Sequence, residues 1–437
     1  MAAWAPDPRS GVPVSGWRDA VAVYRNPRQL TILAMGFASG LPLALTGATL
    51  QVWLTESGVS LTDIGLFALV GFAYSLKFLW APVLDRVPLP WLSTELGQRR
   101  SWLLAIALLL TASIAALGQA DPVVDPWRTA LLAALVAFLS ASQDIVIDAY
   151  RIELLTKEEQ AAGAASTQWG YRFGTIASGA GALALAEAFG WPRSYLVMAS
   201  LISVGLVAAM LSPEPAHPLV RGSFVRAAVV EPFREFVSRP RWGLILVFIL
   251  LYRLSDALSG GMANPFYVKI GFTKLEIASV AKIFGVVATM VGIAAGGAFA
   301  YRLGIARALV AGGVIHGLGN LAFVLQAYLG HDIHALALTI FVENFTGGLV
   351  SAAFVGYLST LCHPAFTATQ FALFTSLTAV GRTMFASGAG WLAEQLGWPL
   401  FFLAAAAAAL PGVTLALVLV SASEGLPFRR ASAASRP

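Results

Sequence analysis

Apolar segments long enough to cross a lipid bilayer recur along the whole chain, and no other feature constrains its fold so strongly. A helix needs about 20 consecutive apolar residues to cross the hydrocarbon core, where the backbone must satisfy its own hydrogen bonds. With 58% hydrophobic and 12% charged residues, the composition excludes an ordinary soluble domain. The sequence therefore predicts an all-α membrane protein. We expect twelve spans, at 29–54, 61–85, 101–118, 128–151, 160–187, 195–212, 241–266, 275–300, 304–328, 335–362, 367–392 and 397–421.

The placement of the basic residues predicts how these spans are oriented. If the N-terminus is cytoplasmic, most of the basic residues outside the spans lie on the cytoplasmic side. The opposite loops then keep only Arg128, Arg193, Lys269 and Lys274. This asymmetry satisfies the positive-inside rule and puts both termini in the cytoplasm. None of the basic residues forms a patch interleaved with aromatics, so no nucleic-acid partner is expected.

A segment rich in proline and arginine divides the chain into two halves that resemble each other. Three short motifs recur in the same order: Gly58–Ile64 with Gly271–Ile277, Ser178–Gly181 with Ser387–Gly390, and Glu187–Trp191 with Glu394–Trp398. Two parallel repeats joined by a linker are the plan of the major facilitator fold, with two six-helix bundles and the substrate near midplane. The expected parts are a cytoplasmic tail (1–28), an N-terminal bundle (29–212), a linker (213–240), a C-terminal bundle (241–421) and a second tail (422–437).

Four carboxylates lie well inside the predicted spans: Asp144, Asp148, Asp256 and Glu343. Charges in membrane spans are costly, so they usually face the bundle interior or an aqueous path. Asp144 and Asp148 share one helix face with Arg151, and we expect Asp148 and Arg151 to form a structural or gating ion pair. Asp144 suits proton coupling and substrate binding equally. Arg253 and Asp256, three residues apart, are expected to neutralise each other.

The second span ends in Asp85 and Arg86, and the loop after it closes with Gly97-Gln-Arg-Arg100. This arrangement resembles the loop between the second and third helices of major facilitator transporters. It predicts a gate at the cytoplasmic end, although a topological anchor alone would look the same.

Other function classes lack support in the sequence. A membrane enzyme would need a nucleophile with its base, or a set of metal ligands, and neither is found. The single Cys362 cannot form an intrachain disulfide, and the histidines lack metal-ligand spacing. The duplicated halves favour a carrier over a channel. We therefore expect neither an enzyme nor a cofactor.

Several longer motifs carry a closer resemblance, which spans roughly residues 29–400. They are Gly40-Leu-Pro-Leu-Ala-Leu-Thr46, Gln51-Val-Trp-Leu54, Lys77-Phe-Leu-Trp-Ala-Pro82, Ser142-Gln-Asp-Ile-Val-Ile-Asp-Ala-Tyr-Arg151, Gly170-Tyr-Arg-Phe-Gly174, Pro265-Phe-Tyr267, Ala281-Lys-Ile-Phe-Gly285 and Phe366-Thr-Ala-Thr-Gln-Phe-Ala372. They resemble the AmpG-type muropeptide permeases, a branch of the major facilitator superfamily related to acetyl-coenzyme A transporters. The Gln-Asp…Asp-Ala-Tyr-Arg string is the most specific of them.

The resemblance implies a multi-pass carrier of the bacterial inner membrane that imports anhydro-muropeptides from the periplasm for peptidoglycan recycling, a process linked to β-lactamase induction. The cargo would be GlcNAc–anhydroMurNAc, with or without a peptide. Transport would be proton symport by alternating access, by a monomer whose partners are the muropeptide, protons and the bilayer. Another large anionic solute, such as acetyl-coenzyme A or a peptide, is the alternative cargo.

The side chains that suit this cargo are cations for peptide carboxylates, aromatic rings for sugar faces, and amides for hydroxyl groups. The residues expected to bind substrate are Gln51, Trp53, Tyr74, Lys77, Gln143, Asp144, Gln168, Tyr171, Arg172, Asn264, Lys282, Asn344 and Arg382. Asp144 and Glu343 are the candidates for proton coupling. Asp85, Arg86, Asp148 and Arg151 are the candidates for gating, and no metal site is expected.

Overall fold

The structure is a computed structural model that describes residues 21–59, 70, 72–215, 230–273, 276–277, 280 and 284–424. All regular secondary structure among these residues is helical. The first half of the chain contains α2 (Pro27–Thr46), α3 (Ala48–Glu56), α5 (Phe72–Leu76), α6 (Ala81–Arg86), α7 (Leu92–Leu96), α8 (Gln98–Gly118), α9 (Pro126–Leu154), α10 (Gln160–Ile176), α11 (Ala182–Phe189), α12 (Trp191–Leu201) and α13 (Ser203–Leu211). After α14 (Glu231–Val237), the second half contains α15 (Trp242–Leu251), α16 (Leu254–Lys269), α18 (Gly285–Leu303), α19 (Ile305–Gly319), α20 (Leu321–Leu329), α21 (Ile333–Thr360), α22 (Thr367–Ala407) and α23 (Ala409–Glu424).

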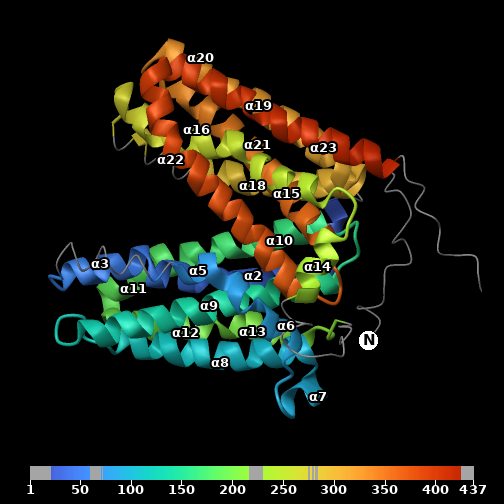
Figure 1. The fold of residues 1–437 in the computed structure, drawn as a ribbon. Helices are drawn as coiled ribbons and strands as arrows, with labels where there is room; N and C mark the ends of the chain where they lie inside the picture. The colour runs from blue at the N-terminus through green and yellow to red at the C-terminus, as the bar shows by residue number, and fades with distance from the viewer. Residues whose placement is uncertain are drawn as a thin grey trace, which may run out of the picture.

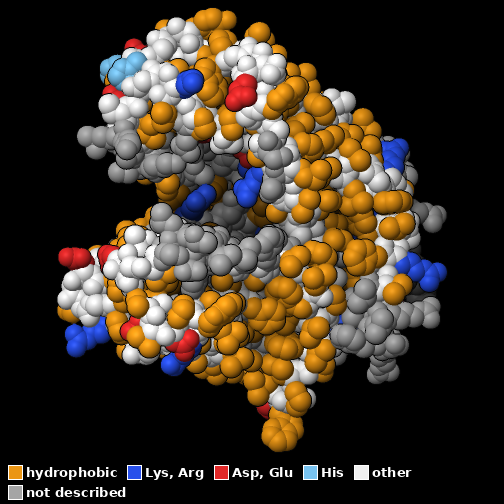
Figure 2. Space-filling view, turned by 60° about the vertical axis from the view of Figure 1, so that its left-hand side comes forward, with side chains coloured by type: hydrophobic (Ala, Val, Ile, Leu, Met, Phe, Trp, Pro, Cys, Tyr) orange, Lys and Arg blue, Asp and Glu red, His pale blue; other side chains and the backbone are white. Residues whose placement is uncertain are grey.

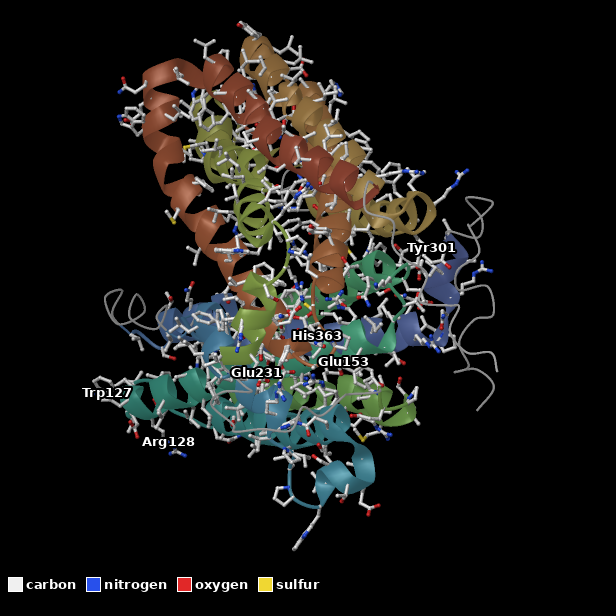
Figure 3. All side chains as sticks on the ribbon, turned by 45° about the vertical axis from the view of Figure 1, so that its right-hand side comes forward. Trp127, Arg128, Glu153, Glu231, Tyr301 and His363 are labelled. Atoms are coloured by element: carbon white, nitrogen blue, oxygen red, sulfur yellow. The ribbon has the colours of Figure 1, made fainter. Side chains whose placement is uncertain are left out.

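The helices of the two halves form two groups, one below the other in Figure 1. The groups meet at the end of the molecule where α14 lies, which we call the linker end. They spread apart toward the opposite end, which we call the open end (Figure 1). In Figure 3, Trp127 and Arg128 mark the open end of the first half, and Tyr301 lies toward the other end of the molecule.

Glycines allow the closest helix contacts in each half. A Cβ added to Gly170 on α10 would lie 2.0 Å from the carbonyl oxygen of Leu33 on α2. In the second half, a Cβ on Gly292 of α18 would lie 2.0 Å from the carbonyl oxygen of Phe345 on α21. Real Cβ atoms cannot approach a backbone so closely, so only glycine permits these crossings.

Nine helical stretches among the described residues are long and apolar enough to cross a membrane. They correspond to nine of the twelve predicted spans. The predicted fifth span is α10 continuing through a π-helical turn (Ala177–Gly181) into α11. Gly397, at φ 70°, divides α22 into the predicted eleventh span and the start of the twelfth. Residues 61–69 and 71 of the predicted second span lie outside the described residues, and the count of twelve is consistent with the structure.

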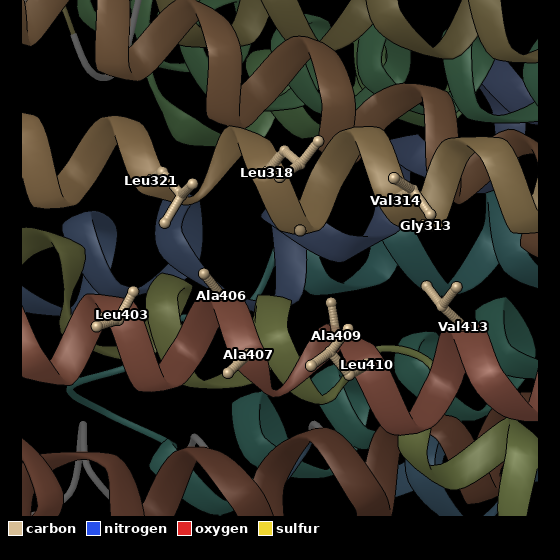
Figure 4. Close-up of a pocket in the computed structure, with 11 residues that line it drawn as sticks. Gly313, Val314, Leu318, Leu321, Leu403, Ala406, Ala407, Ala409, Leu410 and Val413 are labelled. Carbon is tan, nitrogen blue, oxygen red and sulfur yellow. The ribbon is translucent and has the colours of Figure 1, made fainter.

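Apolar side chains cover much of the outer surface of the helices on the face shown in Figure 2. Leu108, Leu109 and Leu131 are more than half exposed in the isolated chain. Exposed leucines in such number have the character expected of a surface in contact with lipid. The apolar groove of Figure 4, between α19 and the α22–α23 segment, belongs to this outer surface. It contains no charged side chain, so it is not the candidate site.

Candidate functional site

Two cavities with polar linings share two residues, Gln168 and Arg172, both on α10; residues of the first half alone line the first, and residues of both halves line the second. The first cavity, of about 320 Å³, is lined by Ser39, Asp144, Ile147, Asp148, Thr167, Gln168, Tyr171 and Arg172. The second, of about 180 Å³, is lined by Gln168, Arg172, Arg253, Asp256, Thr289, Ile293, Glu343, Asn344, Gly347, Gly348 and Ser351. Figure 2 shows the hollow between the halves, with basic side chains inside it.

The two carboxylates of the first cavity come from one face of α9. Asp144 accepts a hydrogen bond from the hydroxyl of Ser39 on α2, with 2.5 Å between the oxygens. One turn further on, Asp148 lies between two cations, 3.9 Å from Lys77 Nζ and 3.5 Å from Arg151 Nη2. Arg151 is fully buried, and its guanidinium also lies 5.2 Å from the ring centroid of Phe371 in the other half. Asp144 therefore has a neutral partner, whereas Asp148 is paired with charges.

The second cavity contains an ion pair and a separate acid. Arg253 donates from Nη2 to Asp256 Oδ2 at 2.7 Å. The Glu343 carboxylate accepts from the neighbouring Asn344 amide at 2.8 Å, and the Asn344 carbonyl oxygen accepts from the Thr289 hydroxyl, also at 2.8 Å. Glu343 has no ion pair within 4.0 Å among the described residues.

Cations and amides at the junction of the cavities can bind an anionic, hydroxyl-rich solute. Arg172 is exposed to the cavities, and no ion pair to it is found among the described residues. Its planar guanidinium can bind a carboxylate through two parallel hydrogen bonds. Tyr171 also lines the first cavity, and aromatic rings of this kind can pack on a sugar face.

Direct contacts between the halves close the floor of the cavities. The side-chain amide oxygen of Gln168 accepts a hydrogen bond from the hydroxyl of Ser351 on α21 at 2.8 Å. Below it toward the linker end, Trp169 Nε1 donates to the Met290 carbonyl, and the Tyr24 hydroxyl donates to the Ala294 carbonyl. A Cβ on Gly356 would lie 2.7 Å from Cα of Ala161 in the other half. The halves are thus packed backbone to backbone on this side of the cavities.

A buried carboxylate at the linker end joins the halves a second time. Asp85 on α6 accepts hydrogen bonds from the backbone N–H groups of Ala368 and Thr369, at 3.1 and 2.7 Å, and from the Thr369 hydroxyl at 2.6 Å. These N–H groups form the first turn of α22, where the partial positive charge of the helix attracts an anion. The other half thereby caps α22.

Arg99 fixes this carboxylate from the opposite side. Its Nη2 atom donates to Asp85 at 2.8 Å and to Glu153 at 2.6 Å, and its side chain is fully buried. Figure 3 shows Glu153, Glu231 and His363 near the seam between the halves. Arg86, next to Asp85, lies with its guanidinium 4.8 Å from the ring centroid of Phe366. Both members of the predicted Asp85–Arg86 pair therefore contact the second half at the linker end.

The helix α14 packs on the same region. Arg239 donates from Nε and Nη2 to the two oxygens of Glu235, at 2.8 and 2.6 Å, and Gln370 of α22 donates to Glu235 at 2.7 Å. Partial burial would raise the pKa of Glu235, but the hydrogen bonds from Arg239 and Gln370 outweigh it and hold that pKa below its ordinary value. Glu235 is therefore held as a carboxylate that joins the linker to α22.

The structure brings together part of the residue set predicted to bind substrate. Asp144, Gln168, Tyr171 and Arg172 line the first cavity, and Asn344 lines the second with Glu343. Lys77 reaches the first cavity through its contact with Asp148.

Other predicted residues lie elsewhere. Trp53 is buried in the core of the first half, where it stacks on Trp191 at 5.5 Å between ring centroids. The side-chain oxygen of Gln143 and the Tyr74 hydroxyl are buried without a hydrogen-bond partner among the described residues, and neither residue lines a cavity. Gln51 and Arg382 are exposed, on α3 and α22. The Asn264 side chain and Lys282 lie outside the described part of the chain.

Several lining residues are not among those predicted to form the site. Ser39, Thr167, Thr289 and Ser351 are small hydroxyl residues, which are common in membrane helices and give no signal of their own. Arg253 and Asp256 were expected to neutralise each other; they do form that pair, but they also line the second cavity.

Comparisons with known proteins agree on one family. The model of the Major Facilitator Superfamily matches residues 32–386. The anhydromuropeptide permease of Escherichia coli K12 is 43% identical over 398 residues, which cover 91% of this chain and 80% of that protein. The putative transporter AmpG 4 of Rickettsia conorii is 34% identical over 405 residues, covering 91% of this chain and 97% of that one.

Solved structures share the fold at low sequence identity. The fucose:proton symporter FucP of E. coli has a TM-score of 0.66 at 13% identity, over 92% of this chain and 98% of that one. The human organic anion transporter MFSD10 has a TM-score of 0.61 at 17% identity, over 92% of this chain and all of that one.

Proposed function

The chain belongs to the major facilitator superfamily, in the branch of the AmpG-type permeases, and on that premise we propose that it is a proton-coupled importer of anhydro-muropeptides. The cargo is GlcNAc–anhydroMurNAc, with or without its peptide, carried from the periplasm to the cytoplasm by alternating access. The observation that carries this proposal is the pair of polar cavities joined at Gln168 and Arg172, the second of which is lined by both halves. The chain is thus a transporter rather than an enzyme.

The chemistry of the cavities suits such a cargo. Arg172 supplies a cation that has no ion-pair partner among the described residues. A lactyl or peptide carboxylate can bind to its guanidinium. Gln168 and Asn344 offer amides to sugar hydroxyls and acetamido groups, and Tyr171 offers a ring face. The concentration of polar groups in a chain that is 58% hydrophobic makes this region the natural place for a hydrophilic solute.

We further propose that the linker end faces the cytoplasm, so that the structure corresponds to a carrier open to the periplasm. The support is the positive-inside asymmetry: Arg86, Arg99, Arg100 and Arg239 lie at the linker end. The termini and the linker 213–240 then belong to the cytoplasmic side of the inner membrane, and 29–212 and 241–421 form the two bundles that move against each other.

Proton coupling is assigned to Asp144 first and Glu343 second. Both line the cavities, and neither forms an ion pair with a cation within 4.0 Å among the described residues. A carboxylate in such surroundings can bind a proton from one side and release it when the movement of the halves changes its environment. Asp148, held between Lys77 and Arg151, is the less suitable group because two cations stabilise its ionised form.

The identity of the cargo is tested by counterflow in proteoliposomes that contain the purified chain. Vesicles loaded with unlabelled anhydro-muropeptide should take up the labelled compound, and external acetyl-coenzyme A should not compete. Exchange of labelled acetyl-coenzyme A by vesicles loaded with it, with no exchange of the muropeptide, would replace the cargo with an acyl-coenzyme A and leave the carrier mechanism in place.

A further inference from the structure

The two ring nitrogens of His316, a buried residue on α19, have different surroundings. Nδ1 lies 2.9 Å from the hydroxyl oxygen of Thr346 on α21. That hydroxyl donates its own proton to the carbonyl of Val342 at 2.7 Å, so its oxygen is free to accept from Nδ1–H. In the neutral ring only one nitrogen carries a proton. The Thr346 contact therefore leaves the other nitrogen, Nε2, with an unprotonated lone pair.

This lone pair points toward a carboxylate. Nε2 lies 3.7 Å from Asp256 Oδ1 on α16, and it has no hydrogen-bond partner among the described residues. His316 is only 6% exposed, so water cannot readily solvate the nitrogen. Two acceptors that face each other in a buried place are unfavourable, because each has lost water without gaining a donor. A single proton on Nε2 converts this contact into an ion pair.

The same carboxylate holds a cation of the cavity. The second oxygen of Asp256, Oδ2, accepts from Arg253 Nη2 at 2.7 Å, and both residues line the second cavity with Arg172. Gly347, another lining residue, lies beside the gap, since a Cβ there would be 3.6 Å from His316 Cε1 and 3.8 Å from Asp256 Oδ1. The second cavity thus extends to the gap between His316 Nε2 and Asp256 Oδ1.

We propose that Asp256 and His316 form a proton-binding site in the C-terminal half, and that its occupation frees Arg253 to bind the anionic part of the substrate. A hydronium ion in the cavity gives its proton to Nε2, an N–H bond forms, and water remains. Asp256 stays ionised and pairs with the imidazolium. Its negative charge is then shared between His316 and Arg253, so it holds Arg253 less strongly. Proton and anion then favour each other's binding, as a symporter requires, and by linkage the effect is reciprocal. The identity of the anion rests on the proposed function, whereas the proton site does not.

The charges around the site agree with this order of events. Asp256 on α16 favours a proton on His316, whereas burial of the ring and Arg253, the residue before α16, oppose it. Glu343 of α21 and Arg382 of α22 act on Asp256 from further away. The other helices against α19 carry ionisable groups mainly near their ends: Tyr301 and Arg302 on α18, Tyr328 on α20 and Glu424 on α23. Asp256 is therefore the carboxylate that holds a proton on His316.

Nuclear magnetic resonance of the labelled imidazole tests the proton site without any substrate. The other four histidines, His217, His331, His334 and His363, are replaced by Gln so that one ring signal remains. We expect that signal to titrate between about pH 5 and pH 8, and to titrate at lower pH in Asp256→Asn, which lacks the carboxylate. A ring that stays neutral over this range, or a titration that Asp256→Asn leaves unchanged, would overturn the proposal.

The coupling to the anion is tested by binding of GlcNAc–anhydroMurNAc-peptide to the purified chain. Affinity should rise as the pH falls from about 8 to about 6, and His316→Gln should reduce that gain by about five-fold or more. The control is His331→Gln, since His331 is exposed, pairs with Glu276 and lies outside both cavities. An undiminished pH dependence in His316→Gln would refute the release of Arg253. If the wild-type chain bound no muropeptide at any pH, the proposed cargo would fail, and the imidazole titration would still decide the proton site.

Discussion

Arg172 illustrates how a single residue links the two halves of the site. It lies on α10 of the first half, yet it lines both cavities, and it faces Glu343 and Arg253 of the second half across the smaller one. Among the described residues no carboxylate neutralises it within 4.0 Å, so a bound anion would be its main counterion. A substrate held by Arg172 would therefore be in contact with both halves at once.

Replacing Arg172 should weaken substrate binding without disturbing the fold. We expect Arg172→Ala to lose about 1.5–3 kcal/mol of binding free energy, the usual contribution of hydrogen bonds to a charged group. Arg172→Lys should recover only part of it, because an ammonium cannot form two parallel hydrogen bonds to a carboxylate. Titration of purified protein with anhydro-muropeptide measures both effects. Arg193→Ala is the matched control, since Arg193 is exposed at the open end; equal affinities for the two alanine variants would rule out a substrate role for Arg172.

Contacts between residues close in sequence could be predicted, and those between distant residues could not. The ion pairs Asp148–Arg151 and Arg253–Asp256 were expected from helical spacing, and both are present. The contact of Asp85 with the first turn of α22 joins residues 284 positions apart. No local pattern carries that information, because it depends on how the halves pack. The roles of these residues in gating and coupling stay predictions.

At the scale of the helix, the crossing of α2 and α10 depends on glycines more than on apolar area. A Cβ on Gly170 would meet the backbone of α2 at Leu33 and Phe37, whereas one on Gly179 would meet nothing within 4 Å. The repeated small residues were visible in the sequence, but which of them lie at a crossing was not. The π-helical turn at 177–181, next to Gly174, also has no signature in the pattern of apolar residues.

Gly170→Ala should destabilise the chain, because the added methyl group forces α2 and α10 apart. Overpacking of this kind costs about 1–3 kcal/mol. Thermal unfolding in detergent should therefore occur at lower temperature for Gly170→Ala than for wild type. Gly179→Ala, the same substitution in open space, should unfold with wild type or slightly above it. Equal losses in both variants would mean that the crossing tolerates a side chain.

The docking of α14 should depend on pH in a direction fixed by Glu235. Its pKa is lower in the folded chain than in the unfolded one, so the ionised form stabilises the fold above the unfolded pKa. That stabilisation is lost as the pH falls through the depressed folded value. Wild type should thus be more stable than Glu235→Gln near neutral pH, and the difference should vanish below about pH 4. Unfolding temperatures measured at both pH values test this; a difference that persists in acid would assign the effect to packing alone.

At the scale of the molecule, the fold class and the family could be inferred from composition, span length and repeated motifs, and both are confirmed. Which end of the carrier is closed could not be inferred from the sequence. That depends on contacts such as Gln168 with Ser351 and Asp85 with Thr369, each formed between the halves. Such contacts join residues far apart in the chain, and no local sequence pattern specifies them.

The orientation in the membrane can be tested by labelling single cysteines from the periplasmic side. In a Cys362→Ser background, a membrane-impermeant maleimide should label a cysteine at Ser57, which lies at the open end. It should not label one at Ser223, which falls in the predicted linker outside the described residues. Labelling of position 223 but not of 57 would invert the proposed topology, and with it the assignment of the open end to the periplasm.

The most direct test of the account is accumulation of labelled anhydro-muropeptide by proteoliposomes under an imposed inward proton gradient. Wild type should concentrate the compound, and Asp144→Asn should not, although exchange at equal concentrations should survive because binding and alternating access remain. Loss of exchange as well would assign Asp144 to binding or structure. An Asp144→Asn variant that still concentrates the muropeptide would exclude Asp144 as the coupling group and move the assay to Glu343→Gln. A wild-type chain that neither exchanges nor accumulates the compound would contradict the account itself.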